Sequence, residues 1–69
     1  MSKFNIELSS APDRENLVAE IWYEKKMIAE VNNESGKFVV EFYFDRTISF
    51  MLDEFVEVLE NAKRRITER

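Results

Sequence analysis

The spacing of apolar residues changes once along this chain, near Ser49, and this change constrains the fold more than any other feature. Before it, apolar and polar residues alternate over several short stretches, which is typical of strands with one buried face. After it, apolar residues recur every three or four positions, as they do on one face of an α-helix. These residues are Leu52, Phe55, Leu59, Ala62 and Ile66. The pattern therefore predicts strands followed by one C-terminal helix.

Four stretches have the alternation of a strand, at about residues 3–9, 17–24, 27–32 and 37–45, and the helix is expected at about residues 50–67. The connections between the strands are short and contain the chain's only proline and only glycine, which favours antiparallel neighbours. We therefore predict an α+β fold in one domain, residues 1–69. It is a four-stranded antiparallel meander sheet with the helix packed on one face, in the order ββββα.

The ends of the expected helix carry charges that suit its macrodipole, with acidic residues in the first turn and basic residues near the end. They are Asp53, Glu54, Lys63, Arg64 and Arg65. Ser49 is the expected N-cap, because serine can accept a backbone N–H of the first turn. No acidic residue follows it three positions later, so a capping box is absent.

The hairpin between the second and third strands has two alternative registers. A two-residue turn at 25–26 would pair Glu24 with the first apolar residue of the next strand and place that strand's apolar side chains on the face of Trp22. A three-residue turn at 24–26 would place them on the face of Ile21, because a slip of one residue turns every side chain over. The side chains concerned are Met27, Ala29 and Val31. We expect the three-residue turn, since it gives one continuous apolar face.

With this register, the two faces of the sheet differ sharply in composition. The face that the helix covers is expected to be apolar: Phe4, Ile6, Leu8, Leu17, Ala19, Ile21, Tyr23, Met27, Ala29, Val31, Phe38, Val40, Phe42 and Phe44. The opposite face mixes carboxylates with aromatic and branched aliphatic side chains: Glu7, Val18, Glu20, Trp22, Ile28, Glu30, Val39, Glu41 and Tyr43. No other expected element remains to cover this second face.

The second face is our candidate binding surface. Its predicted partner-binding residues are Glu20, Trp22, Ile28, Glu30, Glu41 and Tyr43. Aromatic residues are enriched in binding hot spots, and surrounding acids would select a basic protein and speed the encounter. The alternative is an ordinary sheet surface, on which such side chains pack across strands and glutamates confer solubility. A homodimer through this face is disfavoured, because its carboxylates would repel each other.

Composition argues against several other functions. A net charge of −4 disfavours a nucleic-acid partner. The absence of histidine and cysteine removes the commonest general base, the strongest nucleophile, disulfides and thiolate metal sites. A single glycine leaves no glycine-rich phosphate loop. We therefore expect no enzyme activity, cofactor or metal.

The first ten residues lack the apolar core of a signal peptide, and no apolar run approaches the roughly 20 residues of a membrane span. We therefore expect a cytoplasmic protein with no membrane partner. A chain of 69 residues buries only about 60% of its unfolded surface, so its stability is modest. When free it is expected to be a monomer, or a weak dimer through an edge strand.

The stretches NLVAEIWYEKKMIAEV, KFVVEFYF and LDEFVEVLENAKRRI together resemble small acidic immunity proteins of bacterial polymorphic toxin systems, including those of contact-dependent growth inhibition. The resemblance covers most of the chain and is one of size, acidity and layout. It implies a non-catalytic, stoichiometric inhibitor that covers a basic toxin, often a nuclease. Anti-CRISPR and other mobile-element inhibitors are similar on the same grounds. The alternatives of another class are a small ligand-sensing domain and a structural subunit of a larger complex.

Overall fold

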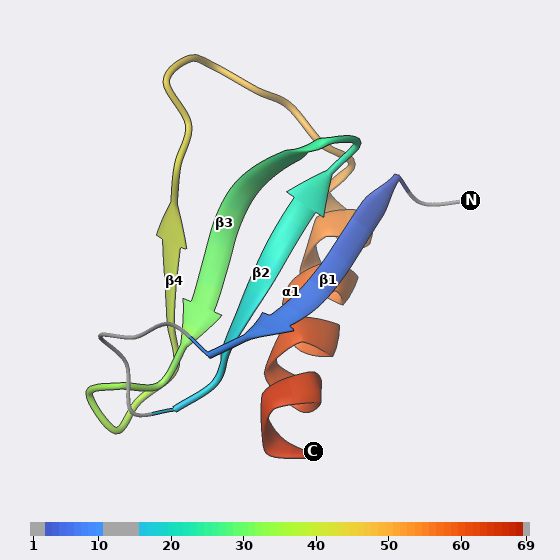
Figure 1. Ribbon diagram of the computed structural model, residues 1–69. Helices are drawn as coiled ribbons and strands as arrows, with labels where there is room; N and C mark the ends of the chain where they lie inside the picture. The colour runs from blue at the N-terminus through green and yellow to red at the C-terminus, as the bar shows by residue number, and fades with distance from the viewer. Residues whose placement is uncertain (1–2, 11–15, 69) are drawn as a thin grey trace.

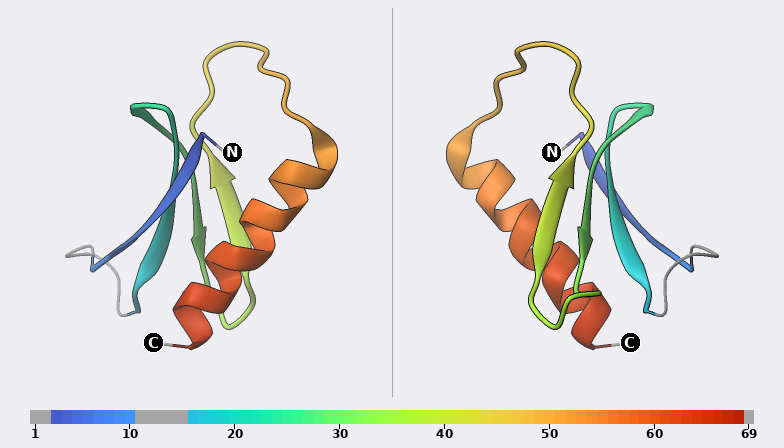
Figure 2. Two further views of the ribbon diagram at one scale, coloured as in Figure 1. Left: turned by 90° about the vertical axis from the view of Figure 1, so that its right-hand side faces the viewer. Right: turned by 90° about the vertical axis from the view of Figure 1, so that its left-hand side faces the viewer.

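The computed structural model describes residues 3–10 and 16–68. Its elements are β1 (Phe4–Ser9), β2 (Val18–Tyr23), β3 (Lys26–Asn32), β4 (Val39–Phe42) and α1 (Leu52–Thr67). The strands form one antiparallel sheet in the order β1-β2-β3-β4, and α1 crosses one face of it (Figures 1 and 2). The predicted ββββα fold is confirmed. Across the described residues, no helix has the length and apolar character needed to cross a membrane.

The chain leaves the sheet earlier than its alternation predicts. β4 ends at Phe42 rather than near residue 45, although the N–H of Tyr43 still donates to the carbonyl oxygen of Ile28 at 2.9 Å. The segment 43–51 then arches from the edge of the sheet to the helix layer (Figure 2). The N-cap is Met51, without a side-chain capping bond, so the prediction of Ser49 as N-cap is wrong.

The start of α1 is positioned by the aromatic ring just before it. Phe50 lies 4.9 Å from the ring of Tyr23, 5.1 Å from that of Phe4 and 5.3 Å from that of Phe55, measured between ring centroids. These contacts hold residue 50 against the end of the sheet, and the helix begins two residues later. Serine at position 49 therefore belongs to the connection and not to the helix terminus.

The β2–β3 hairpin has neither of the two turns considered above. Tyr23 pairs with Lys26, which leaves a two-residue turn at Glu24 and Lys25. Glu24 has a φ of 58°, in the left-handed region that short hairpin turns require. A residue other than glycine in this conformation costs about 1–2 kcal/mol.

A β-bulge then corrects the register of the hairpin. Trp22 pairs with Met27, but Ile21 pairs with Ala29, so Ile28 is an extra residue on β3. The shift returns Ala29 and the rest of β3 to the expected face. Met27, by contrast, lies opposite Trp22, and its predicted place on the helix-covered face is wrong.

The core lies between the sheet and α1. Its buried members are Ala19, Ile21, Ile28, Ala29, Val31, Val58, Ala62 and Ile66. Three of them are alanines that are completely buried, and these small side chains let the helix approach the sheet closely. Phe55 and Leu59, both expected in the core, are half-buried and pack against it.

The helix backbone lies against β1, β2 and β3 and reaches β4 only through the ring of Phe55, which stacks on Phe42, and this explains where the predicted core is wrong. Leu52, expected in the helix stripe, is 74% exposed, whereas Val58, which the stripe omitted, is buried. The phenylalanines of β4 and its flanks, Phe38, Phe42 and Phe44, are also exposed instead of covered. The sheet is therefore wider than the helix that packs on it.

Candidate functional site

A straight row of four glutamates crosses the sheet on the face opposite α1. Glu7 pairs with Glu20, Glu20 with Glu30, and Glu30 with Glu41, so each strand contributes one carboxylate to the same line. Directly opposite residues of neighbouring strands have Cβ atoms about 5 Å apart. The alternation of the strands places these four residues on one face, and the register places them side by side. We call this line the glutamate row.

Two aromatic side chains hydrogen-bond to the glutamate row. The indole Nε1 of Trp22 donates to Oε1 of Glu20 at 3.1 Å, and the hydroxyl of Tyr43 donates to Oε1 of Glu30 at 3.4 Å. The structure therefore brings together five of the six predicted site residues. Together with Glu7 they form what we call the acidic face: Glu7, Glu20, Trp22, Glu30, Glu41 and Tyr43.

The sixth predicted residue, Ile28, is not part of this surface. It is 2% exposed and belongs to the hydrophobic core, because it is the extra residue of the β-bulge and escapes the alternation of β3. Its assignment to the binding face is wrong. Val18 was also expected on this face, but it is only 1% exposed and offers no surface.

Asn32 is a central residue of the acidic face that the sequence analysis missed. Its amide Nδ2 donates to Oε2 of Glu30 at 3.1 Å and to Oε1 of Glu41 at 2.8 Å, so one amide bridges two neighbouring carboxylates. Its Oδ1 accepts the backbone N–H of Glu34 at 3.3 Å, which fixes the amide. The available signal was its position, two residues after Glu30 on the same side of a strand.

The glutamate row concentrates the charge of the molecule. The chain has 14 acidic and 10 basic residues, so the four carboxylates of the row equal its whole excess of negative charge. Like charges directly opposite each other destabilise a sheet. The hydrogen bonds from Trp22, Tyr43 and Asn32 offset part of this cost. The centre of the row is also shielded, since Glu30 is 9% exposed, while Glu7 at its end is exposed.

Replacing Glu7 by glutamine is expected to raise the free energy of unfolding by about 0.5 kcal/mol at low salt. The change removes one like-charge neighbour of Glu20 and keeps the shape of the side chain. The gain should shrink in 0.5 M salt, where screening acts over only a few ångströms. Urea melts at both salt concentrations measure it. Glu60→Gln, on the exposed surface of α1, is the control, and an equal gain there would contradict local repulsion in the row.

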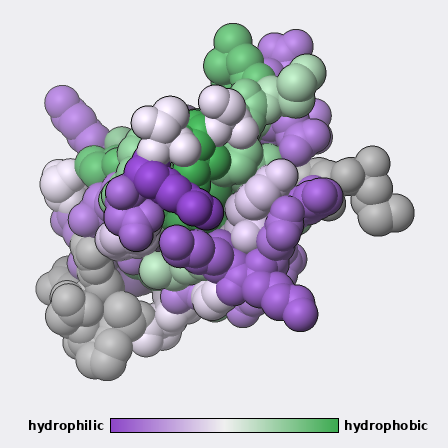
Figure 3. Space-filling view, turned by 90° about the horizontal axis from the view of Figure 1, so that it is seen from above, coloured by the Kyte–Doolittle hydropathy of each residue, from purple (hydrophilic) through white to green (hydrophobic). Residues whose placement is uncertain are grey.

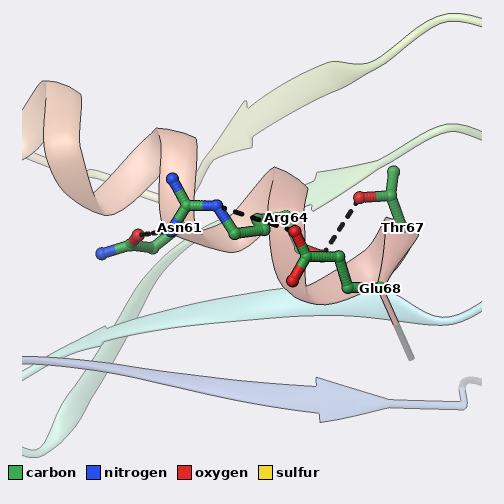
Figure 4. A network of polar contacts seen from close by, with 4 residues as sticks. All are labelled: Asn61, Arg64, Thr67 and Glu68. Atoms are coloured by element: carbon green, nitrogen blue, oxygen red, sulfur yellow. Dashed lines mark hydrogen bonds and ion pairs between the residues drawn. The ribbon is translucent and has the colours of Figure 1, made fainter.

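A second surface feature is a groove of about 540 Å³ between β1 and α1. Its lining is Phe4, Asn5, Ile6, Leu8, Glu57, Val58, Asn61, Arg64, Arg65 and Glu68. The guanidinium of Arg64 is already engaged, donating to Oδ1 of Asn61 at 2.8 Å and lying 3.9 Å from the carboxylate of Glu68 (Figure 4). Arg65 donates to the carbonyl oxygen of Ile6 at 3.4 Å. These contacts tie the end of the helix to itself and to β1, and they leave the acidic face as the stronger candidate site.

The acidic face combines negative charge with aromatic side chains. It offers carboxylates in a row and an aromatic ring at each of two positions beside it. In residues 3–10 and 16–68, no three acidic side chains are grouped so as to hold a metal ion. Comparisons of the chain with protein-family models, with curated proteins and with solved structures give no match.

Proposed function

We propose that this protein is a non-catalytic, stoichiometric inhibitor that binds a basic protein through its acidic face, in the manner of the immunity proteins that neutralise bacterial toxins. The observation that carries the proposal is the glutamate row, with one carboxylate from each of the four strands in register. Such an arrangement disfavours the fold, and departures of this kind concentrate at functional sites.

The residues of the acidic face have three different roles in the proposed binding: anchoring, pairing with basic side chains, and positioning an anchor. Trp22 and Tyr43 supply large apolar area with few rotatable bonds, which suits them as anchors. Glu7, Glu20 and Glu41 pair with lysine or arginine side chains of the partner. Glu30 is buried and accepts the Tyr43 hydroxyl, so it holds the anchor in place instead of meeting the partner directly.

A basic toxin, of which a nuclease is one example, has the complementary surface. Nucleases need positive charge to hold a phosphate backbone. A face with four aligned carboxylates would meet that charge and speed association by long-range attraction. Inhibition requires the two proteins to meet in the same compartment, which we take to be the cytoplasm.

The test uses the proteins encoded beside this chain's gene. Each is co-expressed with the chain, and the complexes are purified and their stoichiometry and salt dependence measured. We expect one basic neighbour to purify with the chain at equal stoichiometry, to be toxic when expressed alone, and to be harmless when expressed with it. An affinity that does not fall with salt, or a neighbour still neutralised by a chain with Glu7, Glu20 and Glu41 all changed to glutamine, would refute the proposal.

A further inference from the structure

The edge of the sheet at β4 carries an apolar surface that the helix covers only in part, through Phe55 against Phe42 and Lys63 over the ring of Phe38. The exposed apolar side chains on this side are Phe38, Phe42 and Phe44 of β4 and its flanks and Leu52 and Val56 of α1, and we call them together the β4 patch. The rings of Phe42 and Phe44 stack on each other with centroids 5.3 Å apart. Figure 3 looks onto the end of the molecule that carries segment 43–51, where hydrophobic side chains stand among hydrophilic ones.

The patch is large for so small a protein. Phe38 is 38% exposed, Phe42 48% and Phe44 36%. With about 200 Å² for a fully exposed aromatic side chain, and the two aliphatic residues added, the patch presents roughly 400 Å² of apolar surface. This is an ordinary size for the largest apolar patch on a monomer, and such patches often have a function.

The backbone beside the patch is an unused sheet edge. β4 is the last strand, and among the described residues it pairs only with β3. The N–H of Tyr43 points inward to Ile28, so the alternation of an antiparallel strand turns the N–H and C=O groups of Val40 and Phe42 outward. The outward backbone groups therefore belong to residues whose side chains lie on the side of the β4 patch.

We propose that a second copy of this chain pairs antiparallel with β4, with the two-fold axis at Phe42. Both copies then offer the same outward groups, as a two-fold contact requires. In this register Phe42 faces Phe42 of the other copy, and Val40 faces Phe44. Glu41 faces Tyr43 on the acidic side. A shift by two residues would instead place Glu41 directly opposite Glu41, where the carboxylates repel each other.

The size of the patch determines the strength of this dimer. A stable interface buries about 800 Å² on each partner, and the β4 patch offers roughly half of that in apolar area. The dimer is therefore weak, and it forms at high micromolar concentration. It joins two sheets into one of eight strands, with both helices on one side and both acidic faces on the other. This contact joins the two acidic faces at Glu41 and Tyr43 and leaves Glu7, Glu20 and Trp22 accessible. It holds whether or not the acidic faces bind a toxin.

A single engineered cysteine tests the pairing and its register, because the chain has no cysteine of its own. In the proposed register the two Cα atoms at position 42 lie about 5.5 Å apart, within the range that a disulfide spans. Phe42→Cys is therefore expected to form a covalent dimer under mild oxidation. Phe44→Cys is the matched control, since residue 44 is similarly exposed but would lie roughly 13 Å from its counterpart.

Sedimentation of the unaltered chain completes the test. We expect the dimer to increase with concentration, and Phe42→Lys to weaken it at least tenfold while leaving the circular dichroism spectrum unchanged. A chain that stays monomeric up to about 1 mM would overturn the proposal. Equal cross-linking of the two cysteine variants, or none at position 42, would overturn the register.

Discussion

Replacing Phe55 by alanine is expected to lower the free energy of unfolding by about 3 kcal/mol, the lower end of the range for a core phenylalanine. Phe55 is half-buried, and its ring lies 5.3 Å from Phe50, 5.7 Å from Phe4 and 6.2 Å from Phe42, between centroids. The ring therefore joins the start of α1 to both edges of the sheet. A domain of this size has only about 5 kcal/mol of stability, so the variant would keep roughly 2 kcal/mol and would unfold at a much lower denaturant concentration.

Leu52→Ala is the matched control for this prediction. Leu52 belongs to the same helical stripe in the sequence, but its side chain is 74% exposed, and we expect a loss below about 0.5 kcal/mol. Denaturant melts of both variants, compared at equal slope, measure the difference. Similar losses at the two positions would show that α1 docks with a different rotation about its axis.

In a complex with the basic partner, Trp22→Ala is expected to weaken binding by about 2 kcal/mol, or roughly thirtyfold. The indole supplies the largest side chain of the acidic face, and its Nε1 also holds the Glu20 carboxylate in place. Trp22→Phe keeps most of the apolar area and should lose less. Titration calorimetry measures the affinities, and circular dichroism checks that each variant is folded.

Substitutions at two glutamates test whether the partner binds the acidic face or the helix. Glu7→Gln should slow association and reduce its salt dependence, because charge at the rim of an interface acts mainly on the encounter. Glu57→Lys, on the exposed surface of α1, should change little. If Trp22→Ala bound normally while Glu57→Lys did not bind, the partner would contact the helix, and the acidic face would be ordinary sheet surface.

The sequence by itself determined the elements, their order and most of the acidic face. Alternation is a local property of a strand. It therefore predicts that Glu7, Glu20, Glu30 and Glu41 lie on one face, without any knowledge of which strands pair. The change in the spacing of apolar residues near residue 49 likewise predicts the helix. These features depend on residues two to four positions apart, and a pattern read along the chain contains them.

Only the tertiary structure decided how these elements meet. The β-bulge places Ile28 in the core and Met27 opposite Trp22. An extra residue interrupts the two-residue alternation of a strand, and no residue type in β3 indicates where this happens. The register it restored aligned the four glutamates into a row.

The lateral position of α1 was equally hidden in the sequence. The helix rests on β1 to β3, so Val58 is buried while Leu52 and Phe42 remain exposed. Hydrophobic periodicity predicts that a helix has an apolar face, but the apolar face of α1 is wider than the part of it that packs on the sheet. Which of its side chains are buried depends on the strands that the helix covers, and that is a property of the packed chain.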